Sequence, residues 1–322
     1  MTARAGSPRQ LATALLGALA LALLAACGGP RAAHACGGAG PTSPAPPRAP
    51  LVFACAAASV DGDPLPELWR LTSSGALPIT SGPAPAQDPA VARSGSRLAY
   101  DSTKDGGPGV FVSRLDGAAP RAFDPAEGGQ TEPAWSPDGG RLVYVSGQQG
   151  LHNPVGVSRS FGSLYVASTA GAAPRPITNG AAYAGEPAWS PTGATIAFAT
   201  DAGGRWQIAT IDPEGRDPRT LTFTGGARWP TWAPGGGEIA FQRTANADGA
   251  GACAIWVMDA MGMGAHRLTW GSQPSWSPDG RWIAFVRANA QGSDLWMISA
   301  RGGPPIRLTE DGGLKRRPSW IG

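Results

Sequence analysis

Short apolar runs alternate with turn-forming residues from residue 51 onward, which is the pattern of short β-strands. In one clear copy, apolar or β-branched residues dominate 187–190, 195–199, 206–211 and 219–222, and Pro and Gly are frequent between them. This unit predicts four short antiparallel strands in about 44 residues, the size of one blade of a β-propeller.

The unit recurs around the phrase Pro-x-Trp-Ser-Pro-x-Gly, with a degenerate first copy and a truncated last one. The prolines that open the copies are Pro89, Pro133, Pro187, Pro230, Pro274 and Pro318, and all steps are 43 or 44 residues except one of 54. A fixed period of this length is typical of a supersecondary unit that stacks on copies of itself.

The position of each strand within the repeat predicts six strands of every kind. Second strands are expected at 51–55, 97–101, 141–145, 195–199, 238–242 and 282–286. Third strands are expected around Trp69, Phe111, Tyr165, Ile208, Trp256 and Trp296, and fourth strands should end at Thr80, Asp124, Thr178, Thr222, Thr269 and Thr309. First strands number six only if 318–320 is included, so the strands 51–55 and 318–320 should share one blade. We predict an all-β, six-bladed β-propeller over 51–322, with ring closure between these two strands that removes free sheet edges.

Large aromatic residues recur in the first strands. They are Trp135, Trp189, Trp232, Trp276 and Trp320. Their regular spacing suggests a site, but we interpret them as structural residues that pack between adjacent blades.

The first 50 residues have a different composition from the repeats. Arg4 and Arg9 precede an apolar run that ends near Ala26, which predicts a signal peptide over 1–26. Leu24-Ala25-Ala26-Cys27 resembles a bacterial lipobox, and this resemblance implies cleavage before Cys27 and lipidation of that residue. An ordinary signal peptide that contains a cysteine is the alternative. Residues 27–50, rich in Gly, Ala and Pro, are expected to form a flexible tether.

The charge balance argues against one class of function, and the cysteine positions limit the possible disulfide bonds. The chain has 26 basic and 23 acidic residues, too even a balance for a nucleic-acid-binding surface. Cys36, Cys55 and Cys253 remain beside Cys27. The blades of Cys55 and Cys253 are predicted to lie two apart, too far for a bond between them, so we expect free thiols, with a link from Cys36 left open.

The repeat resembles that of the TolB-type propellers, most clearly at 255–269 and 276–285. The resemblance covers essentially all of 51–322. TolB carries a small α/β domain before its propeller that contacts partners in the Tol–Pal envelope system, and here the predicted tether takes that place. The repeat is also similar to the propellers of prolyl oligopeptidase-type and tricorn-type peptidases, which carry a separate hydrolase domain.

Candidates for chemistry are few. The sequence has no Gly-x-Ser-x-Gly elbow, and the predicted propeller holds two histidines, His152 and His266. Two histidines from different blades cannot supply the histidine set of the propeller-shaped lyases, so we expect no metal, no cofactor and no enzymatic activity.

The residue before each repeat proline is expected on a loop at the rim of the central channel. These residues are Asp88, Glu132, Glu186, Trp229, Gln273 and Arg317. Three carboxylates are expected to face Arg317 across the opening, an arrangement that could orient a peptide partner. Six solvated loop residues are the alternative. The 54-residue step predicts a long loop with His152, Asn153 and Arg159, which is a second candidate surface or a tolerated insertion.

Together these features predict a non-enzymatic propeller that is tethered in the cell envelope and binds a protein or peptide, such as a peptidoglycan-associated protein. The expected location is the periplasm, at the outer membrane of a Gram-negative cell, because Gly28 rather than Asp follows Cys27. A carbohydrate-binding, small-molecule-binding or hydrolytic propeller and a purely structural assembly module remain as alternatives.

Overall fold

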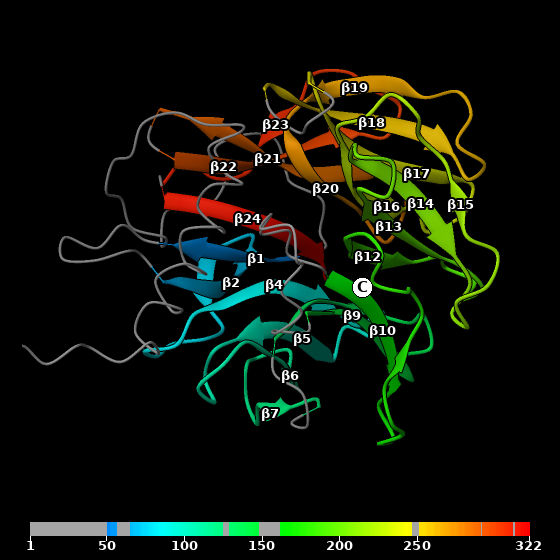
Figure 1. Cartoon of the computed structure of the whole chain (residues 1–322). Helices are drawn as coiled ribbons and strands as arrows, with labels where there is room; N and C mark the ends of the chain where they lie inside the picture. Colours follow the sequence, from blue (N-terminus) through cyan, green and yellow to red (C-terminus); the bar gives the residue numbers. More distant parts are fainter. Residues whose placement is uncertain are drawn as a thin grey trace, which may run out of the picture.

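The computed structural model describes residues 50–56, 65–124, 129–147, 162–246, 251–290, 292–311 and 313–322. Every regular element within these ranges is a β-strand, so the all-β prediction is confirmed there (Figure 1). None of the described segments forms a helix with the length and apolar character needed to cross a membrane.

Four of the sheets have four antiparallel strands each. One is β4 (Ala86–Val91), β5 (Arg97–Ser102), β6 (Gly109–Arg114) and β7 (Arg121–Ala122). The next is β8 (Gln130–Trp135), β9 (Arg141–Gly147), β10 (Gly162–Ser168) and β11 (Arg175–Pro176). The others are β12 (Ala184–Trp189), β13 (Ile196–Thr200), β14 (Gln207–Ile211) and β15 (Arg219–Thr220), and β16 (Ala227–Trp232), β17 (Glu238–Thr244), β18 (Cys253–Asp259) and β19 (His266–Trp270).

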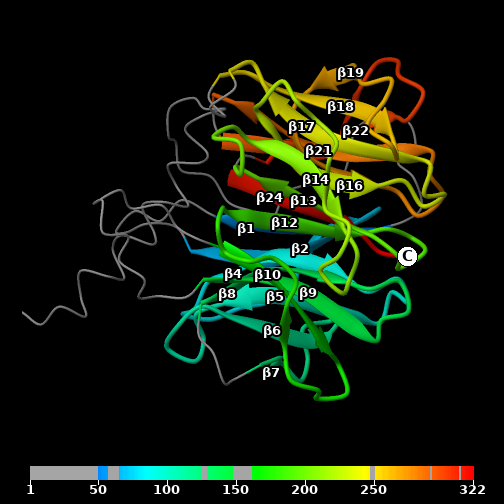
Figure 2. The same cartoon turned by 45° about the vertical axis from the view of Figure 1, so that its right-hand side comes forward.

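The fifth sheet contains eight strands and brings the first and last described segments together. It consists of β20 (Ser272–Trp276), β21 (Trp282–Asn289), β22 (Gly292–Ser299), β23 (Ile306–Arg307), β24 (Gly313–Trp320), β1 (Leu51–Ala56), β2 (Pro66–Thr72) and β3 (Gly75–Pro78). β24 lies antiparallel to β1, with Leu51 opposite Trp320. Figures 1 and 2 show these two strands side by side. β22 meets β24 only through a short parallel contact, in which Gly292 lies opposite Gly313.

The fourth strands end earlier than predicted in five of the six repeats. They stop at Pro78, Ala122, Pro176, Thr220 and Arg307. The threonine two residues further on explains this in four copies, because its hydroxyl oxygen takes the place of a backbone carbonyl. Thr80, Thr178, Thr222 and Thr309 accept hydrogen bonds from the backbone N–H groups of Leu68, Leu164, Ile208 and Leu295 at 2.9–3.0 Å.

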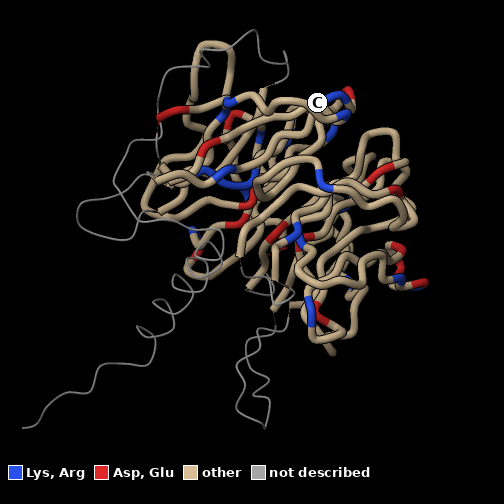
Figure 3. Tube along the Cα trace, turned by 90° about the horizontal axis from the view of Figure 1, so that it is seen from above, with Lys and Arg blue, Asp and Glu red and all other residues tan. Residues whose placement is uncertain are grey.

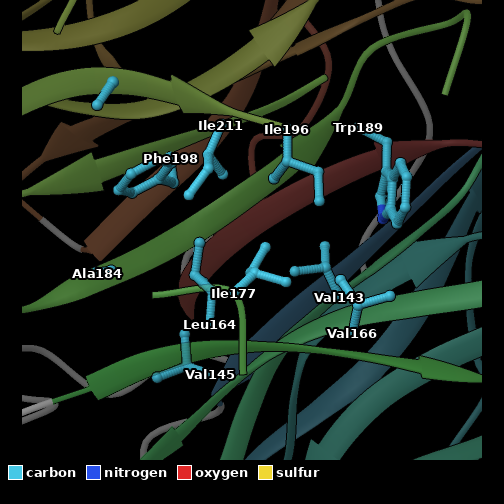
Figure 4. Packing of buried hydrophobic residues seen from close by; sticks show 11 residues of the cluster. Val143, Val145, Leu164, Val166, Ile177, Ala184, Trp189, Ile196, Phe198 and Ile211 are labelled. Atoms are coloured by element: carbon cyan, nitrogen blue, oxygen red, sulfur yellow. The ribbon is translucent and has the colours of Figure 1, made fainter. Parts of the chain in front are cut away.

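Hydrophobic side chains fill the space between neighbouring sheets. In one such cluster, Val143 of β9 and Leu164 of β10 pack against Ile196 and Phe198 of β13, with Trp189 beside them (Figure 4). The first strands of successive sheets contact one another in the order β4, β8, β12, β16, β20 and β24, and β24 contacts β4. This arrangement places the first strands around a common centre.

The repeated tryptophans lie between sheets. Four of the five are buried, and Trp232 is half-buried. The indole N–H groups of Trp135, Trp232 and Trp320 donate to the carbonyl oxygens of Ala90, Ala188 and Ser275 in the preceding first strand, at 2.9–3.2 Å. Each of these side chains therefore connects two sheets by packing and by a hydrogen bond.

Cys55 at β1 and Cys253 at β18 are both disulfide-bonded. The prediction that these thiols are free is wrong. The prediction was based on the expected distance between the two strands that carry Cys55 and Cys253. A disulfide bond requires only that a cysteine lies close enough to each thiol, whichever cysteine that is.

Candidate binding site in the central channel

The six residues before the repeat prolines lie inside the first strands, not on loops as predicted. Each strand starts earlier than expected and contains a β-bulge at this point. We call these residues the bulge residues: Asp88, Glu132, Glu186, Trp229, Gln273 and Arg317, all with φ between 51° and 57°. A bulge re-aims the side chain of its strand. Positive φ is uncommon outside glycine and stores about 1–3 kcal/mol of strain per residue.

Side chains of the bulge residues bond to the backbone of the following bulge. Glu132 Oε2 accepts from the N–H of Glu186, and Glu186 Oε2 accepts from the N–H of Trp229, both at 2.6 Å. Gln273 Oε1 accepts from the N–H of Arg317 at 2.9 Å. These bonds satisfy the backbone N–H groups at the bulges and offset part of the backbone strain.

Arg317 reaches across the channel to three other first strands. Its Nε lies 2.6 Å from Asp88 Oδ1 and its Nη2 lies 3.2 Å from Glu132 Oε1. Its guanidinium carbon lies 3.3 Å from the centroid of the Trp229 ring. The expected separation of carboxylates from Arg317 is therefore wrong, because the bulges turn these side chains inward, where opposite charges pair.

A second ion pair lies deeper. Glu186 Oε1 pairs with Arg228, and both side chains are at least nine-tenths buried. The Arg228 guanidinium also covers the Trp206 ring at 4.2 Å from its centroid. On the other side, Asp101 of β5 is 2% exposed and lies behind Asp88.

Burial changes the acidity of these groups. Desolvation, together with the charges of Glu186 and Asp88, raises the pKa of Glu132 to about 7 in spite of the attraction of Arg317. Burial and the neighbouring Asp88 also raise the pKa of Asp101 well above its usual range. Burial opposes the charge on Arg317, but Asp88 and Glu132 outweigh it, so its pKa is raised.

A cavity of about 360 Å³ lies on the side of the bulge residues toward which the first strands run. Its lining includes the small side chains of Ala90, Ala134, Ala188, Thr231, Ser275 and Ser319, together with the repeated tryptophans Trp135, Trp189, Trp232, Trp276 and Trp320. Its opposite end is bordered by Arg93, Pro137, Pro191, Pro234, Pro278 and Gly322, of which Arg93, Pro278 and Gly322 are exposed. Figure 3 marks the acidic and basic positions along the trace. The bulge residues thus form the polar floor of a pocket with a mainly apolar wall and rim.

Of the remaining candidates, only His266 lies among the described residues, and it does not line this pocket. His266 is exposed on β19, and His152, Asn153, Arg159 and Cys27 lie outside the described residues. Among the described residues, no three His, Cys, Asp or Glu side chains are arranged to hold a metal ion.

Sequence reasoning missed two charged residues beneath the floor, Asp101 and Arg228. Asp101 ends a predicted strand directly after Leu98, Ala99 and Tyr100, and Arg228 directly precedes the bulge residue Trp229. A charge at the channel end of a buried strand is the signal that could have indicated them.

Sheets of four antiparallel strands whose first strands surround a shared pocket define a β-propeller with a central site. The chain belongs to the TolB beta propeller domain family, whose model matches residues 78–321.

Individual relatives are similar over part of their length. The chain is 27% identical over 194 residues to the uncharacterized peptidase YuxL of Bacillus subtilis, covering 48% of this chain and 29% of that protein. It is 30% identical over 123 residues to the Tol-Pal system protein TolB of Anaeromyxobacter dehalogenans, covering 36% of this chain and 27% of that protein. The chain therefore matches less than a third of the length of these relatives.

The fold also resembles a solved structure of TolB from Acinetobacter baumannii, with a TM-score of 0.72 and 20% sequence identity. The match covers 85% of this chain and 66% of that one. At this identity the likeness concerns the fold alone.

Proposed function

We propose that this chain is a six-bladed, non-enzymatic propeller of the cell envelope that binds a protein or peptide partner in its central pocket. In this proposal the eight-stranded sheet is two blades joined by the short contact of β22 with β24. One blade is then β20 to β23, and the other is β24 with β1, β2 and β3. The cyclic order of contacts among the first strands supports a closed ring.

The main observation behind the binding proposal is that the strained backbone of the bulge residues and the central cavity occur at the same place. All six bulge residues hold an unfavourable backbone conformation, and their side chains form the floor of the pocket. Strained residues often cluster at ligand sites, where the surrounding structure holds them. A solved relative in fold and a curated relative in sequence both have the name TolB, which favours an envelope partner such as a peptidoglycan-associated protein.

A hydrolytic function is the second candidate, because one relative is named as a peptidase. We favour binding over hydrolysis because the carboxyls of the floor are engaged in ion pairs and backbone hydrogen bonds. Glu132 and Glu186 each accept a hydrogen bond from the backbone N–H of the next bulge residue. Both carboxyls therefore have a structural role.

Lipidation at Cys27 and location in the periplasm, at the outer membrane, belong to the same proposal. Pro50 accepts a hydrogen bond from the N–H of Ile321 at 2.9 Å, next to Gly322 at the pocket rim. A tether over 27–50 would thus join the propeller beside the mouth of the pocket. A Cys27→Ala chain should move from the membrane fraction to the soluble fraction, and continued membrane retention would contradict the anchor.

The binding proposal can be tested by placing a photo-crosslinking amino acid at Arg93, an exposed position on the rim. Illumination of intact cells should yield a covalent adduct with one envelope protein. The same amino acid at exposed Arg205, between β13 and β14, is the matched control and should yield none. Equal labelling at both positions, or no adduct at Arg93, would count against the proposed function.

A further inference from the structure

The floor of the pocket holds more carboxyls than nearby cations can pair with. Glu186 has its own partner in Arg228. The remaining acidic groups, Asp88, Glu132 and Asp101, lie close to the guanidinium of Arg317, and Arg316 is a further cation near Asp88, which gives four carboxyls and three arginines. Carboxylates this close to one another in a partly desolvated site repel, so an additional positive charge would be favourable there.

A buried carboxyl beside the floor supports the same conclusion. Asp101 is 2% exposed and its side chain shares hydrogen bonds with Asp88 and Gln87, while its Oδ1 atom has no hydrogen-bond partner among the described residues. A carboxylate that is buried beside another carboxylate is costly, so such a group holds a proton instead. The raised pKa values of Asp101 and Glu132 are consistent with protons that replace a missing cation.

The space above the floor suits a long, thin side chain. Its walls include the small side chains of Ala90, Ala134, Ala188, Thr231, Ser275 and Ser319, and the tryptophans of five first strands also line it. The volume of about 360 Å³ is near the lower end of the ~300–1,000 Å³ typical of small-molecule sites. Lysine and arginine carry an apolar stem behind a charged head, which matches an apolar wall above a polar floor.

We propose that the pocket receives a basic side chain, arginine or lysine, of a partner peptide, with its apolar stem along the small wall residues and its charged head over Glu132. This inference rests on the proposed function as a peptide-binding propeller. An acidic group of a partner would compete with Asp88 and Glu132 for Arg317 and would be repelled by both.

Binding should release a proton. The charged head favours the carboxylate of Glu132, so the carboxylic acid gives its proton to solvent as the cation enters. The groups that face Glu132 are Asp88 of β4, Glu186 of β12, Tyr183 just before β12, and Arg317 of β24. Asp101 of β5 contacts Asp88, Arg228 pairs with Glu186, and Arg316 lies near Asp88. Because Glu132 titrates near pH 7, affinity for a cation should fall about tenfold from pH 8 to pH 6.

The test uses capped peptides of the sequence acetyl-Ala-Pro-Arg-Pro-Ala-amide, with Arg replaced by citrulline or by Glu in matched peptides. Citrulline keeps the shape of arginine and lacks its charge. Calorimetry at pH 8 should show at least about tenfold tighter binding of the Arg peptide than of the citrulline peptide. The preference should shrink at pH 6, and proton release should be measurable from the dependence of the heat on the buffer.

The variant Glu132→Gln should lose both the preference for Arg and its pH dependence, while Glu238→Gln, at the exposed first residue of β17, should behave as the native chain. Equal binding of the Arg and citrulline peptides, no binding of the Arg peptide, or tighter binding of the Glu peptide would overturn the inference. If Glu132→Gln does not fold, the comparison of peptides on the native chain decides alone.

The two proposals can fail separately. A protein captured at Arg93 together with equal binding of the Arg and citrulline peptides would refute the basic side chain and leave the proposed function in place. Binding of the Arg peptide with no protein captured would refute the proposed function and leave the chemistry of the pocket in place.

Discussion

The residue before each repeat proline has the same left-handed backbone conformation whether it is Asp, Glu, Trp, Gln or Arg. Its conformation is therefore set by the bulge, and its side chain is free to differ from sheet to sheet. The sequence indicates these positions through the following proline. It does not indicate their contacts, because Arg317 and Glu132 are 185 residues apart and meet only when the sheets surround the channel.

The buried pair of Arg228 and Glu186 should be the most sensitive ion pair of the site. Replacing Arg228 with Met leaves the Glu186 carboxylate buried without its cation, and we expect a loss of about 3–5 kcal/mol in the free energy of unfolding. Denaturant unfolding at pH 8 measures this. The double variant Arg228→Met, Glu186→Gln removes the charge and should recover much of the loss. Arg216→Met, in an exposed ion pair, should leave the free energy of unfolding almost unchanged.

Glu132 should make stability depend on pH. Its pKa is about 7 in the folded chain and near 4.5 in the unfolded one, so the folded state binds more protons between these values. Its contribution to stability is full below about pH 4.5 and is lost as pH rises to about 7. Glu132→Gln should therefore be more stable than the native chain at pH 8, by about 1–3 kcal/mol, with a smaller difference at pH 5. Identical pH profiles for both chains would contradict the raised pKa.

At the scale of strands and sheets, most of the architecture could be predicted. Alternating apolar positions and Pro or Gly turns predicted where the second strands begin. The predicted first residues agree with the observed ones to within two residues, as at Ile196–Thr200 and Glu238–Thr244. The bulges and the short fourth strands could not be predicted in this way. A bulge adds one residue without a change in composition, and a threonine hydroxyl that replaces a carbonyl is indistinguishable in sequence from a threonine within a strand.

The threonine hydroxyls at the ends of the fourth strands should have a measurable role. Thr222 is buried and accepts from the N–H of Ile208 at 2.9 Å. Thr222→Val keeps the shape and leaves that N–H unpaired, at an expected cost of about 1–3 kcal/mol. Hydrogen exchange of the Ile208 amide should accelerate in this variant, and Thr222→Ser should restore protection. Native protection in Thr222→Val would show that another acceptor serves this amide.

At the scale of the whole molecule, β24 and β1 combine segments from opposite ends of the described chain in one sheet. The pairing of Leu51 with Trp320 holds these segments together, and β24 also supplies Arg317 to the pocket. The predicted pairing of these strands is present, whereas the tether and lipid anchor lie outside the described residues. In a closed ring, this single sheet would couple the stability of the fold to the charge arrangement of the pocket.

Circular permutation tests that coupling. A short Gly-rich linker from Gly322 to Leu51, with new ends between the exposed residues Gly82 and Pro83, makes β24, β1, β2 and β3 consecutive in the chain. If the ring is closed as proposed, the permutant should unfold in one cooperative transition, with stability within about 1 kcal/mol of the native chain, because no sheet is then split between the ends of the chain. The control is a permutant whose new ends lie at the turn of Gly203 and Gly204. In this control the new ends divide the sheet of β12 to β15, so it should be the less stable of the two permutants. If the first permutant fails to fold while the second does fold, β24 and β1 are not joined as the closed ring requires.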